Sequence, residues 1–114
     1  MSTESCNLTD KSCKPCEGGM TPMEQREIET MLQALPGWQH HKGQISKTYT
    51  FKNFHETMAF VNAVAEVAHK EDHHPNLEVS YKNCVIHYST HAIGGLSEND
   101  FICAAKIDAL TVNQ

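Results

Sequence analysis

The fold is decided by the stretch Asn76-Leu-Glu-Val-Ser-Tyr-Lys-Asn-Cys-Val-Ile-His-Tyr88, along which apolar and polar side chains alternate. Period two places successive side chains on opposite faces, so this stretch predicts a β-hairpin. We place Lys82-Asn83 at the two turn positions, because asparagine tolerates the backbone of tight turns. Extended outward, this register sets His74 opposite His91. The sequence therefore predicts that the hairpin brings two imidazoles together on one rim.

Histidines flank the hairpin on both sides. Asp72-His73-His74-Pro75 precedes it and Ser89-Thr90-His91 follows it. Imidazole has the side-chain pKa closest to neutral, at about 6.5. A cluster of imidazoles beside carboxylates is suited to moving protons or to holding a metal ion, and both interpretations are open at this point.

Composition narrows the class of protein. The chain has 114 residues, which is the size of one domain, and a net charge of -5 argues against nonspecific binding to nucleic acid. No apolar run approaches the roughly 20 residues of a membrane span, and the polar start is unlike a signal peptide. We therefore expect no membrane contact, a cytoplasmic location, and free thiols at most of the 5 cysteines.

The chain divides into a tail and one domain. Residues 1–20 are polar, carry Cys6, Cys13 and Cys16, and are predicted to form a mobile arm. Residues 21–114 are predicted to form the single domain. Its first helix is expected to open at Thr21-Pro22, with Glu24 as a capping partner, and to stop at Pro36-Gly37.

The remaining elements follow in order. Two strands are expected between residues 38 and 51, turning near Lys42-Gly43, and then a helix capped by Asn53 that ends before Pro75. After the hairpin, Ser97 is expected to cap a third helix. The order helix, two strands, helix, two strands, helix favours an α+β fold, in which a four-stranded antiparallel sheet carries its helices on one face.

Two apolar faces are predicted to meet in the core. The hairpin contributes Leu77, Val79, Tyr81, Cys84, Ile86 and Tyr88, which share one face of the strands. The second helix contributes Phe54, Met58, Val61, Ala65 and Ala68, which recur at helical spacing. The opposite face of the hairpin is too polar for a core, so it is either solvated or a functional site.

Three motifs together resemble the pterin-4a-carbinolamine dehydratase family. They are Asp72-His73-His74-Pro75, Ser89-Thr90-His91 and Gly95-Leu-Ser-Glu-Asn-Asp-Phe101, and the similarity covers roughly residues 21 to 112. The tail Cys13-Lys-Pro-Cys16-Glu-Gly-Gly19 also looks like the arm of bacterial members. One departure is Asn76-Leu77, where several members have an acidic residue and an aromatic one.

The resemblance implies a function and its residues. The function is dehydration of a 4a-hydroxytetrahydropterin to the quinonoid dihydropterin, which regenerates the cofactor of aromatic amino-acid hydroxylases. The family's catalytic histidines map onto His73, His74 and His91. Pro75, Thr90 and Asp100 are expected to contact the substrate. The resemblance also implies a homodimer or homotetramer and a hydroxylase as a candidate partner, without metal or other cofactor.

The chemistry suits these residues. Loss of water from a carbinolamine needs a proton delivered to the departing hydroxyl and one removed from the adjacent ring nitrogen, and histidines near their pKa do both. We expect His74 and His91 to transfer protons and His73 to orient the pterin as a further donor. Asp100 lies three residues after Ser97, so it is expected to complete a helix cap, to support the site, or both.

Two alternatives belong to other classes of function. The histidines with nearby carboxylates could bind zinc, and Cys13-x-x-Cys16 has the spacing of half a zinc site, but no second pair completes it. The family resemblance also includes members that act as dimerisation cofactors of a homeodomain transcription factor. Such an interaction module would work through helix or sheet-edge surfaces, without the histidines.

Overall fold

Four antiparallel strands form one sheet in the computed structural model of the protein, which describes residues 8–14 and 21–112. The strands are β1 (Gln39–His41), β2 (Gln44–Thr50), β3 (Asn76–Val79) and β4 (Asn83–Tyr88). Their order across the sheet is β1-β2-β4-β3, so β2 and β4 form the centre. The predicted turn at Lys42-Gly43 joins β1 to β2, with a positive φ at both residues.

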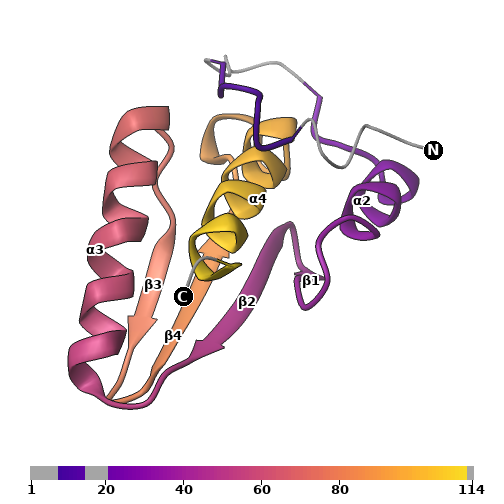
Figure 1. The fold of residues 1–114 in the computed structure, drawn as a ribbon. Helices are drawn as coiled ribbons and strands as arrows, with labels where there is room; N and C mark the ends of the chain where they lie inside the picture. Colours follow the sequence, from indigo (N-terminus) through magenta and orange to yellow (C-terminus); the bar gives the residue numbers. More distant parts are fainter. Residues whose placement is uncertain (1–7, 15–20, 113–114) are drawn as a thin grey trace.

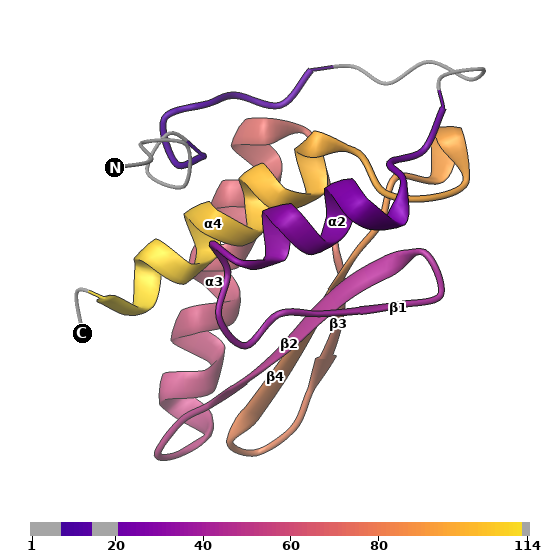
Figure 2. The ribbon, with the colours of Figure 1, turned by 90° about the vertical axis from the view of Figure 1, so that its right-hand side faces the viewer.

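The helices lie on one side of this sheet. They are α2 (Gln25–Leu32), α3 (Phe54–Glu71) and α4 (Glu98–Val112), and a short 3-10 turn, η1 (His91–Ile93), precedes α4. Figure 1 shows α4 in front of the central strands, and Figure 2 shows all three long helices on the same side of the strands. The predicted α+β class and element order are confirmed. Within the described part of the chain, no helix is both long and apolar enough to cross a membrane.

Helix α2 begins later than predicted. Its N-cap is Glu24, which forms a capping box with Glu27, so the expected opening at Thr21-Pro22 is wrong. The backbone N–H of Met23 donates to the carbonyl of Leu96 at 2.9 Å. This bond ties the residues before Glu24 to the segment that leads into α4, so the helix starts only after them.

The register of the β3–β4 hairpin differs from the predicted one. Leu77 pairs with Ile86 and Val79 with Cys84, so the turn residues are Tyr81 and Lys82. The turn therefore lies one residue earlier than expected, and each pairing moves by two residues. A two-residue shift keeps every side chain on its predicted face, except that Tyr81 leaves the strand and is 65% exposed.

Contacts from outside the hairpin account for this register. Asn83 pairs with Thr50 of β2, and their side chains are 2.9 Å apart, so Asn83 belongs to the sheet and not to the turn. The turn carbonyls are also engaged. Phe51 N–H donates to Lys82 at 2.7 Å, and the Thr57 hydroxyl donates to Tyr81 at 3.0 Å. Turn propensity alone could not reveal these partners.

The buried face of α3 also differs from the predicted stripe. The fully buried side chains are those of Thr57, Phe60, Val64 and Ala68, whereas Phe54 is 49% exposed. Of the predicted stripe, Ala68 alone is buried, and Met58 and Val61 are half-buried. Thr57 is placed inward by its hydroxyl bonds to the carbonyls of Asn53 and Tyr81. A polar residue therefore holds a core position that a hydrophobicity pattern assigns to its neighbours.

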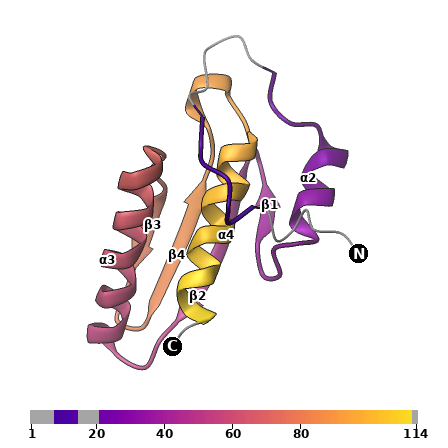
Figure 3. The same ribbon diagram turned by 45° about the horizontal axis from the view of Figure 1, so that its top comes forward.

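Helix α4 is the centre of the core. Phe101, Ile102, Cys103, Ala104 and Ile107 are all at most 1% exposed, because the sheet and the other structural elements enclose the helix. Residues 8–14 lie beside it, as Figure 3 shows in indigo, with Leu8 buried in the core cluster. The mobility predicted for residues 1–20 stays a prediction, and Cys6 and Cys16 lie outside the described residues.

The carboxylate of Asp108 links α4 to the hairpin formed by β1 and β2 and to Trp38 just before it. Asp108 accepts hydrogen bonds from the indole N–H of Trp38 at 3.2 Å, from Lys47 at 2.9 Å and from the hydroxyl of Tyr49. Trp38 and Tyr49 are only 5% and 6% exposed, so water could not replace this acceptor easily. Burial, followed by the bond to Asp108, raises the pKa of Tyr49. Asp108 therefore satisfies polar groups that the core would otherwise leave unpaired.

We expect Asp108→Ala to lower the free energy of unfolding by about 3 kcal/mol, because it leaves buried donors without an acceptor. Urea denaturation measures the change. Glu66→Ala, at an exposed position of α3, is the control and should change stability by less than about 0.5 kcal/mol. Equal stability of the two variants would contradict the proposed importance of the Asp108 contacts.

Candidate active site

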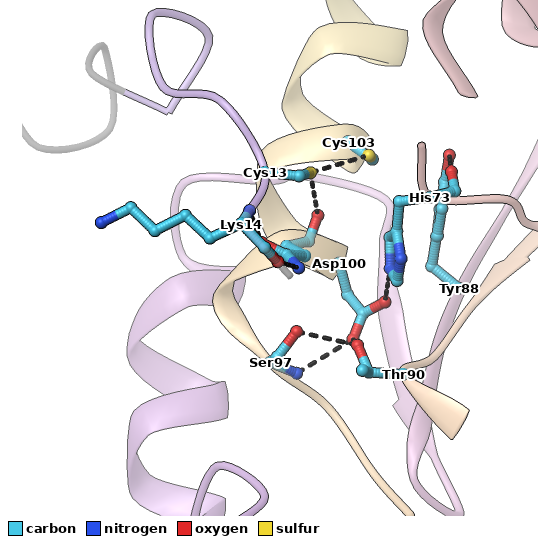
Figure 4. Close-up of polar contacts among 9 residues, drawn as sticks. Cys13, Lys14, His73, Tyr88, Thr90, Ser97, Asp100 and Cys103 are labelled. Carbon is cyan, nitrogen blue, oxygen red and sulfur yellow. Dashed lines mark hydrogen bonds and ion pairs between the residues drawn. The ribbon is translucent and has the colours of Figure 1, made fainter. Parts of the chain in front are cut away.

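A buried ion pair lies at the base of the candidate site. His73 Nε2 is 2.6 Å from Asp100 Oδ1, with the His73 side chain 13% exposed and that of Asp100 fully buried. Figure 4 shows the two side chains pointing toward each other, from the end of α3 and the start of α4. The ion pair thus joins the residue that follows the C-cap of α3 to the first turn of α4.

Asp100 holds a helix cap and a histidine at the same time. Its second oxygen, Oδ2, accepts from the backbone N–H of Ser97 and from the Thr90 hydroxyl, both at 2.9 Å. The Thr90 and Ser97 hydroxyls are in turn 2.8 Å apart. The helix cap that the sequence predicted for Asp100 is therefore present, and the same carboxylate also contacts His73.

The main chain fixes where His73 lies. Asp72 ends α3 in the left-handed conformation, with φ 52, and the N–H of His73 donates to the carbonyl of Ala68 at 3.1 Å. The Tyr88 hydroxyl donates to the His73 carbonyl at 3.0 Å, and the two rings stack with centroids 5.2 Å apart. His73 is thus oriented by its backbone, by its ring face and by its ring nitrogen.

The surroundings of His73 favour its charged form. Burial lowers its pKa, but the hydrogen bond and the charge of Asp100 outweigh burial, and the pKa of His73 is raised above 6.5. His73 therefore keeps its proton at a higher pH than an ordinary surface histidine. A group of this kind can donate a hydrogen bond or a proton near neutral pH.

A pocket of about 420 Å³ opens above this pair. It is lined by Lys14, Asp72, His73, His74, Ser89, Thr90, His91, Ala92 and Asn99. His74 and His91 are exposed, and among the described residues neither side chain forms a hydrogen bond or an ion pair. The pocket thus presents two unengaged imidazoles beside a third that is held in place.

The structure places some of the predicted site residues around the pocket and others outside it. His73, His74, His91 and Thr90 line the pocket, whereas Pro75 does not, and Asp100 lies buried behind His73. The predicted cross-strand pairing of His74 with His91 is wrong, because ladder pairing ends at Asn76–His87 and His91 begins η1. The two histidines nevertheless line the same pocket.

Several lining residues were missed by reasoning from the sequence. Asn99 lies within the motif at residues 95–101 but was given no role, and Tyr88, which stacks on His73 without lining the pocket, was assigned only to the core face. Nothing in the sequence pointed to Lys14 as part of the pocket wall. Its position depends on a docking contact, in which Asn99 accepts from the Lys14 N–H at 3.0 Å and donates to its carbonyl at 2.6 Å.

The other histidines lie apart from this pocket. His87 is bonded to Glu78 at 2.5 Å on the open face of the sheet, and His55 and His69 are exposed on α3. Within residues 8–14 and 21–112, no three side chains of the metal-binding types are grouped to hold a metal ion. Cys16 of the Cys13-x-x-Cys16 motif lies outside the described residues.

Comparison with known proteins places the chain in a family of hydro-lyases. Residues 21–110 match the family described as Pterin 4 alpha carbinolamine dehydratase, and the chain belongs to that family. A relative from Nitrosomonas eutropha is 57% identical over 112 residues, covering 97% of this chain and 99% of the relative. One from Nitrosomonas europaea is 60% identical over 109 residues, covering 95% and 96%. Both carry the provisional name pterin-4-alpha-carbinolamine dehydratase.

Solved structures share the architecture. A protein of Brucella melitensis, described as a transcriptional coactivator/pterin dehydratase, matches with a TM-score of 0.76 and 30% identity, over 79% of this chain and 98% of that chain. A pterin dehydratase-like protein, described as a RuBisCO assembly factor in the alpha-carboxysome, matches with a TM-score of 0.55 and 26% identity, over 64% and 84%. The fold therefore occurs in proteins with differently described roles.

Proposed function

We propose that this chain dehydrates a 4a-hydroxytetrahydropterin to the quinonoid dihydropterin by histidine acid–base catalysis. The observation that carries the proposal is a pocket in which His74 and His91 stand unengaged beside a third imidazole held by a buried carboxylate. A pocket of about 420 Å³ is within the range that small-molecule sites occupy. The proposal extends the family assignment to a particular substrate and mechanism.

The reaction needs two proton transfers at neighbouring atoms. The carbon–oxygen bond at position 4a breaks as the hydroxyl takes up a proton and leaves as water. The adjacent ring nitrogen loses its proton, and its electrons form the new double bond. One acid and one base on either side of the substrate suffice, and no covalent intermediate with the protein is required.

We assign His74 and His91 to these transfers. Both line the pocket from different segments, and both are exposed, so each ring is open to solvent or to a substrate. Their unengaged state suits groups that must gain and lose a proton in each cycle. Either histidine can serve as the acid, with the other as the base.

We assign a positioning role to His73. Its ring is stacked on Tyr88 and bonded to Asp100, so it presents a fixed edge to the pocket. Because Asp100 raises its pKa, His73 holds its proton and can donate to an acceptor atom of the pterin. This arrangement would orient the substrate between His74 and His91, which transfer the protons. In a cell, such turnover would recycle the cofactor of an aromatic amino-acid hydroxylase.

A stopped-flow assay tests the proposal directly. The 4a-hydroxytetrahydropterin is generated in the flow cell, and its loss is followed with and without the protein. We expect the protein to accelerate dehydration well above the spontaneous rate, which must be subtracted, and to do so equally after treatment with a chelator. A rate equal to the spontaneous one would refute the proposal and favour a non-enzymatic interaction module. Activity lost together with stoichiometric metal would favour the metal alternative.

A further inference from the structure

Two thiols meet where residues 8–14 cross α4. Cys13 Sγ and Cys103 Sγ are 3.5 Å apart, although 90 residues separate them in the chain. Figure 4 shows the pair above the His73–Asp100 contact. Neither thiol has a part in the proposed dehydration, so the reason for their proximity lies elsewhere.

The contact is held by a set of bonds on both sides of Cys13. The Cys13 N–H donates to Glu71 Oε1 at 2.8 Å, and the neighbouring Lys14 exchanges two hydrogen bonds with Asn99. Further along, Lys11 is 2.6 Å from Glu98. The main chain of Cys13 is thus anchored to α3 and α4, and the sulfur is presented to Cys103.

We propose that Cys13 and Cys103 are a redox modification site, at which hydrogen peroxide forms a disulfide that clasps residues 8–14 onto α4. A disulfide needs its sulfurs about 2.0 Å apart, so the two must approach by roughly 1.5 Å. Cys13 lies outside any helix or strand, so the approach of its sulfur breaks no hydrogen bond within a helix or the sheet.

The reaction balances with peroxide as the oxidant. The Cys103 thiolate attacks one peroxide oxygen, the O–O bond breaks, and the leaving hydroxide takes up the proton that Cys103 lost, giving water and a sulfenic acid. Cys13 sulfur then attacks the Cys103 sulfur. The S–S bond forms, the S–O bond breaks, and the leaving hydroxide takes the Cys13 proton as a second water. The thiols lose two electrons, which the peroxide gains.

Electrostatics support this order of events. The hydrogen bond from Cys13 is the largest cause that lowers the pKa of Cys103, and the charge of His73 lowers it further against the opposing effect of burial. The pKa of Cys13 is raised, first by the same hydrogen bond. Cys103 is therefore the thiol of the pair that loses its proton more readily, and Cys13 is the one that keeps its proton. Since Cys103 is fully buried beneath Cys13, a small oxidant is required.

Cys84 provides a comparison within the same molecule. It is also fully buried, but burial alone raises its pKa, and it faces the core from near the start of β4. A thiol in these surroundings is expected to be inert. Burial alone thus raises the pKa of a thiol in this protein, so the lowered pKa of Cys103 comes from its contacts.

Peptide mass mapping after peroxide treatment tests the proposal, but the wild-type chain gives ambiguous peptides. Trypsin leaves Cys13 and Cys16 on one peptide, because it does not cut before Pro15, and it leaves Cys84 and Cys103 on another. The variant Cys6→Ser/Cys16→Ser/Cys84→Ala retains only Cys13 and Cys103. We expect a non-reducing digest of this variant to contain a cross-linked peptide that dithiothreitol releases.

Melting temperature gives a second measurement. A bond that closes a 90-residue loop should raise the melting temperature of the oxidised protein by on the order of 10 °C, reversibly with reductant. Cys13→Ser, on the exposed side of the pair, should show no peroxide-dependent shift, and Cys84→Ala should keep the full shift. Cross-links between chains, a Cys13–Cys16 bond in the wild type, or sulfinic acid at Cys103 without a cross-link would overturn the proposal.

Discussion

His91→Ala should reduce the catalysed rate of pterin dehydration by at least about 100-fold, and His74→Ala should do the same. A positioned acid–base group contributes about 100- to 10,000-fold, and each histidine is proposed to carry one of the two proton transfers. Both side chains are exposed at the pocket rim, so replacing them removes little buried surface from the folded protein. The fold and the melting temperature should therefore barely change.

His55→Ala is the matched control, because His55 is exposed on α3 and does not line the pocket. Its rate should equal that of the wild type in the same stopped-flow assay. Circular dichroism and thermal melts of all three variants separate loss of chemistry from loss of structure. If His91→Ala turned over substrate at close to the wild-type rate, the assignment of proton transfer to this residue would be wrong.

Asp100→Asn should damage both stability and catalysis. The substitution removes one partner of a buried ion pair, which typically costs about 3–5 kcal/mol, and asparagine keeps part of the hydrogen bonding. We therefore expect a loss of about 3 kcal/mol in the free energy of unfolding. We also expect at least a tenfold fall in the catalysed rate, because His73 loses the group that orients it.

The pH dependence of this effect has a definite sign. Asp100 raises the folded-state pKa of His73 above 6.5, so the protonated pair stabilises the fold fully below about pH 6.5. That contribution is lost as the pH rises through the raised pKa. The stability difference between wild type and Asp100→Asn should therefore shrink on the alkaline side. An NMR titration should show a lower pKa for His73 in the variant, and an unchanged pKa would refute the proposed electrostatic role.

The element order and the histidine cluster could be predicted from the sequence because both depend on local patterns. Alternation along β3 and β4, the turn at Lys42-Gly43 and the cap at Asn53 act over a few residues, and each is present in the structure. The histidine motifs lie immediately beside predicted elements. Because the hairpin folds back, the segments before β3 and after β4 lie at the same end of the sheet, although His74 and His91 are not paired across the strands.

The details that failed depend on partners distant in the chain. The hairpin register follows from contacts of Asn83 and Lys82 with β2 and the residue after it, which no property of the turn itself encodes. Lys14 is held at the pocket by its hydrogen bonds with Asn99, and Asp108 accepts hydrogen bonds from Trp38 and from residues of β2. Side chains of this kind have no periodicity, so reasoning from sequence alone passes over them.

Asp100 couples the opening of the candidate site to the fraying of the first turn of helix α4. The same carboxylate that orients His73 receives the N–H of Ser97, the residue that precedes the first turn of the helix. When that end of the helix frays, the amide becomes open to exchange with solvent and the imidazole loses its anchor in the same event. Hydrogen exchange at the single amide of Ser97 thus reports how often the proposed catalytic arrangement opens.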